Sequence, residues 1–417
     1  MEVKRGYKQT EVGAIPEDWG IVSLSALLRQ GPTNGWSGRS TSDTTGTPTL
    51  SLAATTSGRL VLNGETVKYL ENRIPSRSDL FLAPGDILVQ RSNTAELVGT
   101  TAVFDGPPGV FVYPDLMMRL RFKLPVTGQW FWRYANSASG RSYFRSIAAG
   151  SAGSMPKISG AKLRDMPVPL PARGEQEGIG EALSDADGLI DSLEQLLTKK
   201  RQLKQGTMQA LLTGKKRLPG FETKPGYKQT EAGVIPEDWE VATLDAVCSM
   251  KSGEGITSPS IDRFSKYPCY GGNGLRGFTT RFTHNGRYAL IGRVGALCGN
   301  VLSVEGMFFA SEHAIVVTAS PRTDSRWLTF VLGEMRLNKY SESSAQPVLS
   351  VSKLLRLEVA LPSTKAEQEA IAAVLSDMNA ETAALEMELA KARGLKQGMM
   401  QELLTGRIRL PCTHPTP

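Results

Sequence analysis

The chain has 417 residues, 40% of them apolar and 21% charged, and its formal net charge is +7. This length predicts two to four domains, each with enough apolar residues to bury its own core. The mild basic excess favours a polyanionic partner, although a solvated basic surface gives the same balance. We expect no membrane partner, since no run of apolar residues approaches the roughly 18 that a spanning helix needs.

Cysteine and histidine are both rare. The four cysteines form no CxxC pair, which argues against a disulfide framework and favours a reducing compartment. The first ten residues, MEVKRGYKQT, lack the apolar core of a signal peptide, so we expect a cytoplasmic protein. One segment contains Cys269, His284, Cys298 and His313, but their irregular spacing lacks the paired ligands of a zinc site, and we expect no metal.

Two blocks of sequence occur twice. Residues 6–19 read GYKQTEVGAIPEDW and residues 226–239 read GYKQTEAGVIPEDW, with 12 of 14 positions identical. Residues 203–214, LKQGTMQALLTG, recur at 395–406 as LKQGMMQELLTG, with 10 of 12 identical. We call the first pair the openers and the second pair the closing blocks. The matched blocks predict two similar surfaces, suited to two copies of one partner or to each other.

The bodies between the blocks differ, and the second interval is 28 residues shorter. Both bodies, at about 20–172 and 240–364, have an α+β pattern. Strands are predicted in the first body at 86–90, 100–104 and 116–122, and in the second at 288–292 and 313–318. Each body then contains an aromatic-rich amphipathic segment, at 129–139 and 325–337. Dissimilar bodies predict two different targets.

Each half ends in a long predicted helix. The helices follow Pro171 and Pro362, end at Gly214 and Gly406, and contain roughly 40 residues each. Their apolar residues alternate in steps of three and four, which is typical of a coiled-coil seam. We predict that ten of these residues pack between the helices or against a partner: Ile179, Leu189, Leu193, Leu196 and Leu203 from the first helix, and Ile371, Met378, Leu385, Leu395 and Met399 from the second. Alternatively, each amphipathic helix covers its own body.

The motifs of common catalytic sites are missing from the sequence. It contains no GxxxxGK[ST] phosphate loop, no GxGxxG after a strand, no acidic-Pro-Pro-aromatic motif, and no GxSxG or HExxH. Pro114-Asp115 is followed by Arg121-Phe122-Lys123, which is an incomplete nuclease pattern. We therefore expect no catalytic residue.

Both halves of the sequence have the same order of segments: an opener, a variable body, a Leu-Pro pair, an EQxxI segment and a closing block. This order, present twice, resembles that of the specificity subunits of type I restriction–modification systems. Segments 90–99 and 267–274 resemble parts of their target-recognition domains. The resemblance implies an α+β fold in which two globular target-recognition domains are separated by two long helices packed as an antiparallel coiled coil, with an internal pseudo-twofold repeat. The predicted boundaries are 1–172 and 226–362 for the recognition domains, 173–214 and 363–406 for the helices, 215–225 for a linker and 407–417 for a tail.

The resemblance also implies partners. Each recognition domain would read one half of a bipartite, asymmetric site in double-stranded DNA. The helices would bind two modification subunits that carry the adenine-N6 methyltransferase and its S-adenosylmethionine, so this chain would bind no cofactor. Restriction subunits with motor and nuclease activity can join such complexes.

Base reading needs Arg, Lys, Asn and Gln side chains in the major groove. The predicted DNA-binding residues are Gln90, Arg91, Ser92, Asn93, Lys157 and Lys162 in the first body, and Tyr270, Asn273, Arg276, Arg293 and Lys353 in the second. Basic residues after the helices, including Arg217 and Arg409, could neutralise phosphates or complement a helix dipole. Two further hypotheses stay open: a coiled-coil scaffold that reads no DNA sequence, and an enzyme that acts alone.

Overall fold

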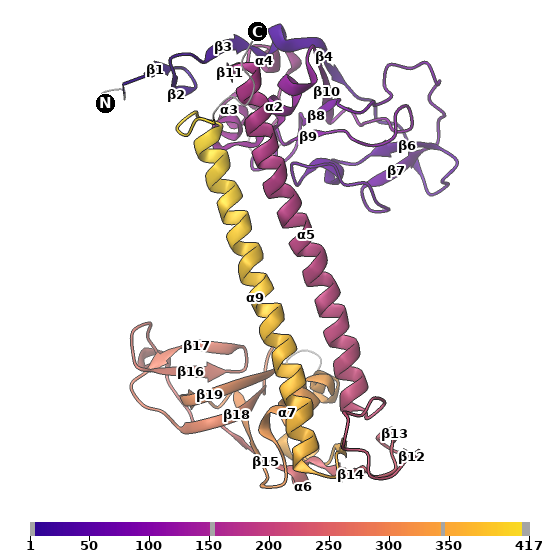
Figure 1. The fold of residues 1–417 in the computed structure, drawn as a ribbon, viewed down its shortest axis with the longest axis vertical. Helices are drawn as coiled ribbons and strands as arrows, with labels where there is room; N and C mark the ends of the chain where they lie inside the picture. The colour runs from indigo at the N-terminus through magenta and orange to yellow at the C-terminus, as the bar shows by residue number, and fades with distance from the viewer. Residues whose placement is uncertain (1–4, 151–154, 343–346, 411–417) are drawn as a thin grey trace. The chain divides into compact units, whose positions relative to one another are not determined.

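A computed structural model describes residues 5–150, 155–342 and 347–410. The chain forms two compact units, each built from both halves of the sequence. Unit 1 contains Met1–Ser192 and Leu389–Pro417, and unit 2 contains Leu193–Glu388. Each unit therefore has one opener and one body, together with parts of both long helices. Sheets and helices are mixed in both units, and the predicted α+β class is confirmed (Figure 1).

The body of unit 1 is built on an antiparallel sheet with strand order β4-β10-β8-β9. Its strands are β4 (Leu28–Asn34), β8 (Ile87–Gln90), β9 (Thr101–Val103) and β10 (Met117–Phe122). A smaller sheet in the order β5-β7-β6 precedes β8 and contains β5 (Ser40–Thr41), β6 (Thr47–Leu50) and β7 (Val67–Leu70), with the 3-10 turn η1 (Leu52–Thr55) beside it. Strands β8, β9 and β10 lie within the three segments that the alternation pattern predicted.

Helix α2 (Pro125–Asn136) packs against β9 and β10 of the larger sheet, and α3 (Ala138–Ile147) packs against α2. The aromatic residues of α2 form the centre of the core, because Trp130, Phe131 and Tyr134 are all buried. Trp130 meets Trp19 of the opener segment edge to face, with ring centroids 5.4 Å apart. Such aromatic pairs add to the free energy gained from burial alone, so the opener is part of the core of its unit.

The body of unit 2 has a six-stranded sheet with the order β15-β20-β18-β19-β16-β17. All of its pairings are antiparallel except that of β16 with β19. The strands are β15 (Cys248–Ser252), β16 (Tyr267–Gly271), β17 (Gly274–Thr279), β18 (His284–Gly292), β19 (Val301–Ala310) and β20 (Ala314–Ala319). Helix α7 (Ser325–Glu334) packs against this sheet. The body also contains the 3-10 turns η2 (Ser258–Ser260) and η3 (Leu337–Tyr340).

The elements around the two bodies are of the same kind in both units, and we call them the frame. Each opener is a tight hairpin, formed by β1 (Tyr7–Thr10) with β2 (Gly13–Pro16) and by β12 (Tyr227–Thr230) with β13 (Gly233–Pro236). A two-stranded sheet then joins the start and end of each body. These sheets pair β3 (Gly20–Ser23) with β11 (Pro167–Leu170) and β14 (Glu240–Thr243) with β21 (Glu358–Leu361), and the short helices around them are α1 (Leu24–Leu27), α4 (Gly160–Arg164), α6 (Leu244–Val247) and α8 (Val351–Leu354).

The two long helices are α5 (Arg173–Leu212, 40 residues) and α9 (Lys365–Leu403, 39 residues). A helix of 40 residues is about 60 Å long. Gly214 and Gly406 follow the helices with φ of 68°, the left-handed conformation that commonly ends a helix. Within each unit the two helices run antiparallel, as the pairs Asp187–Lys396 and Glu175–Arg409 of unit 1 and Arg201–Glu386 and Arg217–Glu367 of unit 2 indicate.

The predicted seam is only partly buried. Ile179, Leu193 and Ile371 are buried, and Met378, Leu385 and Met399 are half-buried. Leu189, Leu196, Leu203 and Leu395 are 50%, 40%, 51% and 62% exposed, so they do not pack between the helices of this chain, and contact with a partner stays a prediction for them. In α5 the buried face lies one residue further along, at Leu183, Ile190, Leu197 and Leu211. Both rows are apolar at matching steps, so the repeat alone could not fix the phase.

No helix among the described residues is long and apolar enough to cross a membrane. Cys248, Cys269 and Cys298 are buried free thiols, and burial raises the pKa of Cys248 to about 12. Cys412 and His414 lie outside the described residues. In the part of the chain that the structure describes, no group of three or more His, Cys, Asp or Glu side chains could hold a metal ion.

Candidate nucleic-acid interface

Each opener is joined to both long helices by one arginine. In unit 1, Arg409 contacts Glu175 at 2.5 and 2.9 Å and Asp18 at 2.9 and 2.7 Å. The indole of Trp19 donates to Glu175 at 3.0 Å. We call Asp18, Trp19, Glu175 and Arg409 the unit 1 junction. Because Arg409 follows α9 while Glu175 begins α5, the junction fixes the end of one helix to the start of the other.

The same arrangement recurs in unit 2, and we call Asp238, Trp239, Glu367 and Arg217 the unit 2 junction. Arg217 contacts Glu367 at 2.7 and 3.1 Å and Asp238 at 2.6 and 3.2 Å, and Trp239 donates to Glu367 at 3.2 Å. Burial raises the pKa of Glu367, whereas hydrogen bonds from Arg217 and Thr223 outweigh burial and hold the pKa of Asp238 below its ordinary value.

These contacts correct the alternatives considered for Arg217 and Arg409, since both guanidinium groups are bound to carboxylates inside a unit. The arginine comes in each case from the end of the other half of the repeat. The closing block of the first half therefore completes unit 2, and that of the second half completes unit 1. The sequence analysis did not predict these junctions, although each arginine lies three residues after a closing block and each aspartate and tryptophan lies in an opener.

The strand end of the first body places four predicted residues together. Arg91 and Ser92 follow β8, and Ser92 pairs through its backbone with Lys157. Gln90 is fully buried, and its amide donates to Leu52 O and Thr55 Oγ1, both at 2.9 Å. Ser92 is also buried, at 1% exposure. The prediction that Gln90 and Ser92 read bases is therefore corrected: their side chains lie inside the body, where Gln90 holds the strand end.

The remaining candidates in the first body lie nearer the surface. Arg91 and Asn93 are half-buried, and Asn93 donates to Gln90 Oε1 at 2.7 Å. Lys157 and Lys162 are exposed, and Lys162 donates to the carbonyl of Ile147 at 3.0 Å. Within the described ranges Arg91 has no carboxylate partner. The structure thus brings Arg91, Asn93 and Lys157 to one edge of the body.

The candidates in the second body occupy two sites. Tyr270, Asn273 and Arg276 belong to the β16–β17 hairpin, in which Asn273 and Arg276 are exposed and Tyr270 packs edge to face on Phe308 at 5.9 Å. Arg293 follows β18 and donates to Ser252 Oγ at 3.0 Å. Lys353 forms an ion pair with Glu342 at 2.9 Å. Gly274 in the hairpin turn has φ of 89°, which agrees with a turn-forming role for this glycine.

Arg91 and Arg293 have equivalent positions in the two bodies. Each arginine follows a central strand, and its carbonyl accepts a hydrogen bond from the segment that leads into a short helix. The carbonyl of Arg91 accepts from Ile158 N, before α4, at 2.8 Å, and that of Arg293 accepts from Leu349 N, before α8, at 2.9 Å. In both residues Nε is buried without a partner in the structure. A buried unpartnered donor is costly. The matched backbone contacts place these two arginines at equivalent strand ends of the two bodies.

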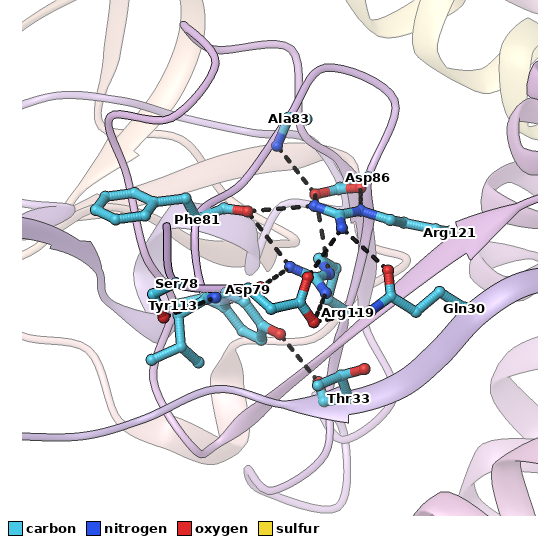
Figure 2. Close-up of polar contacts among 11 residues, drawn as sticks. Gln30, Thr33, Ser78, Asp79, Phe81, Ala83, Asp86, Tyr113, Arg119 and Arg121 are labelled. Carbon is cyan, nitrogen blue, oxygen red and sulfur yellow. Dashed lines mark hydrogen bonds and ion pairs between the residues drawn. The ribbon is translucent and has the colours of Figure 1, made fainter. Parts of the chain in front are cut away.

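Sequence reasoning missed a partly buried charge network in the first body (Figure 2). Arg119 is 1% exposed and donates to Asp79 at 3.0 Å, while Arg121 contacts Asp86 at 2.7 Å and Gln30 at 3.0 Å. Burial raises the pKa of the neighbouring Tyr113 to about 12. The network ties the loop around Asp79 and Asp86 to strands β4 and β10. These arginines alternate with apolar residues in β10, so the sequence shows only a strand there.

Comparisons with known proteins agree with this arrangement. Residues 236–392 match the family described as type I restriction modification DNA specificity domain. Over 137 residues the chain is 43% identical to the type I restriction enzyme EcoprrI specificity subunit of Escherichia coli, covering 32% of this chain and 34% of that protein. It is 27% identical over 259 residues to the putative type I restriction enzyme MjaX specificity subunit of Methanocaldococcus jannaschii, covering 62% of this chain and 59% of that protein.

The matched region thus spans about a third and about three fifths of these two relatives. The fold is similar to the crystal structure of the S subunit of a type I restriction-modification system from M. genitalium. That likeness has a TM-score of 0.62 at 15% identity and covers 97% of this chain and 98% of the other. Residues 236–392 thus match the DNA specificity domain of type I restriction–modification systems, and the whole chain has a fold similar to that of a specificity subunit of such a system.

Proposed function

We propose that this chain is a non-catalytic DNA-recognition subunit whose two bodies read the two halves of a bipartite, asymmetric site in double-stranded DNA. The observation that carries the proposal is the matched placement of Arg91 and Arg293 at the strand ends of two otherwise different bodies. Arginine donates two hydrogen bonds in a fixed fork, and it is the side chain that most often reads guanine in the major groove. Equivalent arginines in different surroundings suit two different half-sites.

The proposed contact set follows from exposure and free hydrogen-bonding groups. Gln90 and Ser92 are excluded because both are buried. In the first body the set is Arg91, Asn93, Lys157 and Lys162, and in the second it is Tyr270, Asn273, Arg276 and Arg293. Lys353 is a weaker candidate, since its ion pair with Glu342 would have to open. The lysines would contact phosphates, which positions the protein without specifying sequence.

We further propose that the closing blocks bind two copies of a modification subunit that carries the adenine-N6 methyltransferase and its S-adenosylmethionine. Leu203 and Leu395 occupy the same position in the two blocks, and they are 51% and 62% exposed. One lies in each unit. Exposed leucines at equivalent positions on two helices are suited to two copies of one apolar partner surface. A restriction subunit with motor and nuclease activity would join the same complex.

The test is a map of methylated adenines in cells that contain the chain and its methyltransferase partner. We expect a bipartite motif with two unrelated halves. Arg91→Ala should relax the sequence requirement in one half, and Arg293→Ala in the other, with about 1 to 3 kcal/mol of discrimination lost at the affected base pair. The matched control, Arg287→Ala, removes an exposed ion pair with Glu305 and should leave both halves unchanged.

The opposing hypothesis is a coiled-coil scaffold that reads no DNA sequence. On that hypothesis the methylation pattern would not depend on either arginine, and the purified chain mixed with its partner would retain all duplexes of a random pool equally. Loss of both halves in a single arginine variant would also contradict the proposal, because each body would then fail to act on its own half-site.

A further inference from the structure

Phe264 has the greatest exposure of the large apolar side chains in the part of the chain that the structure describes, at 95%. It lies in unit 2 between η2 and β16. Single exposed apolar residues are common on protein surfaces, so exposure alone identifies no site. The backbone that carries Phe264 and the charges around it provide the further observations.

The turn that carries Phe264 is fixed by the preceding aspartate. Asp262 Oδ1 accepts hydrogen bonds from the backbone N–H of Phe264 at 2.7 Å and of Ser265 at 2.6 Å, and Oδ2 accepts from Ser265 Oγ at 2.6 Å. These bonds hold the pKa of Asp262 below its usual value. The backbone of Asp262 also pairs with Phe278 of β17 in both directions, at 2.9 and 2.8 Å.

A close backbone contact supports the same turn. Gly277 of β17 lies against Asp262, where an added Cβ would come within 2.7 Å of the Asp262 carbonyl oxygen. The glycine therefore allows the segment before Phe264 to pack on the edge strand. A side chain presented by a fixed backbone loses less conformational entropy when it binds than one on a mobile loop. Phe264 is thus pre-organised in an exposed position.

The surroundings of Phe264 carry an excess of positive charge. Arg263 and Arg276 are exposed and have no carboxylate partner among residues 5–150, 155–342 and 347–410. Lys266 lies 5.2 Å above the ring of Tyr267. Asp262 is the one acidic residue in the segment 262–266, and its carboxylate accepts hydrogen bonds from backbone N–H groups within the turn. The unpaired charge beside the phenyl ring is therefore cationic and suits a polyanion.

We propose that Phe264 is a wedge that inserts between neighbouring base pairs of the half-site read by the second body, while Arg263 and Arg276 contact the flanking phosphates. Apolar side chains used in this way partly unstack one base step and kink the duplex. The cost of unstacking depends on the step, so insertion would add sequence preference without a hydrogen bond to any base. This inference rests on the proposed DNA-reading function and adds a residue to it.

The test uses the purified full-length chain and a duplex carrying the bipartite motif from methylation mapping, with 2-aminopurine placed at successive steps of the second half-site. We expect the fluorescence to rise at one step when the wild-type chain binds, because the probe loses its stacking partner. Phe264→Ala should abolish that rise and weaken binding by about tenfold, the scale of one aromatic–base stack. Phe264→Leu should retain part of both effects.

The control is Met387→Ala, which removes another exposed apolar side chain, 69% exposed, from α9 in the same unit. It should leave fluorescence and affinity unchanged. The inference is overturned if Phe264→Ala keeps both the fluorescence rise and the affinity, or if it loses affinity while the rise persists. In either case the wild-type chain still selects the motif and the proposed function stands. If the wild-type chain selects no sequence, the proposed function itself fails.

Discussion

The two units contain the same junction but attach their bodies to the helices differently. In unit 1 the carboxylate of Asp187 on α5 is 8% exposed and is approached by Arg133 of α2 and Arg59, both at 3.3 Å, and by Lys396 of α9 at 2.5 Å. The equivalent position on α9 is Asn379, which is exposed in unit 2. A buried charge cluster therefore attaches the first body to the long helices, and the second body has no charge cluster at the equivalent position.

The difference follows from the bodies. Arg133 lies three residues after Trp130 in α2, and the residue three after the corresponding Trp327 in α7 is Phe330. A phenylalanine cannot pair with a carboxylate, and Phe330 packs at the border of the unit 2 core instead. The repeated frame accepts either a charged or an apolar side chain at this position. The reason is that the junctions, which both units share, hold the openers and helix ends together independently of the body.

The largest expected effect tests whether the two junctions are equally important. Arg217→Met leaves Glu367 and Asp238 buried and unpaired, at 2% and 3% exposure, and should destabilise unit 2 by about 3 to 5 kcal/mol. Arg409 is 41% exposed and Asp18 64%, while Glu175 is 2% exposed. Arg409→Met therefore leaves one buried carboxylate without its cation where Arg217→Met leaves two, and it should cost about 2 kcal/mol. Hydrogen exchange of the two openers measures each loss separately, and equal losses would contradict this ranking.

The next effect concerns the difference between the bodies. Asp187→Asn gives unit 1 the residue found in unit 2, but it leaves Arg133 buried without its carboxylate, and burial already lowers the pKa of Arg133. We expect a loss of about 2 to 4 kcal/mol, because one partner of a buried ion cluster is removed. Faster hydrogen exchange in α2 is the measurement. The reciprocal control, Asn379→Asp, adds an exposed charge and should change stability by less than about 0.5 kcal/mol.

The smallest expected effect is a pH dependence. Hydrogen bonds from Arg217 and Thr223 lower the pKa of Asp238 in the folded chain below the ordinary value of 3.8. Unfolding therefore binds a proton, so the stabilisation is complete above that value and is lost as the pH falls through the folded pKa. The raised pKa of Glu367 acts in the opposite direction and makes the net loss smaller.

Asp238→Asn isolates this contribution. In urea unfolding between about pH 5 and pH 2, the wild-type chain should lose stability more steeply than the variant, since only the wild type has the lowered carboxyl pKa. Parallel profiles for the two chains would mean that Asp238 contributes nothing to the acid sensitivity of unit 2.

The sequence by itself determined the repeat, the α+β class of the bodies, the two long helices and the residues that end them. These features depend on local patterns: alternation in the strands, steps of three and four in the helices, and a glycine at each helix end. It also indicated which segments belong to the shared frame, because the openers and closing blocks are nearly identical. The family resemblance rested on the order of those same blocks.

Only the tertiary structure decided which half of the repeat completes which unit and which side chains remain at the surface. Arg217 and Arg409 meet their carboxylates across 150 and 234 residues, and no local pattern encodes a contact at that separation. Leu196 and Leu197 are chemically identical neighbours, yet only Leu197 is buried, because the packing of the second helix selects one face. Gln90 and Arg91 are likewise adjacent, and the direction of one side chain into the core decides which of them can meet a ligand.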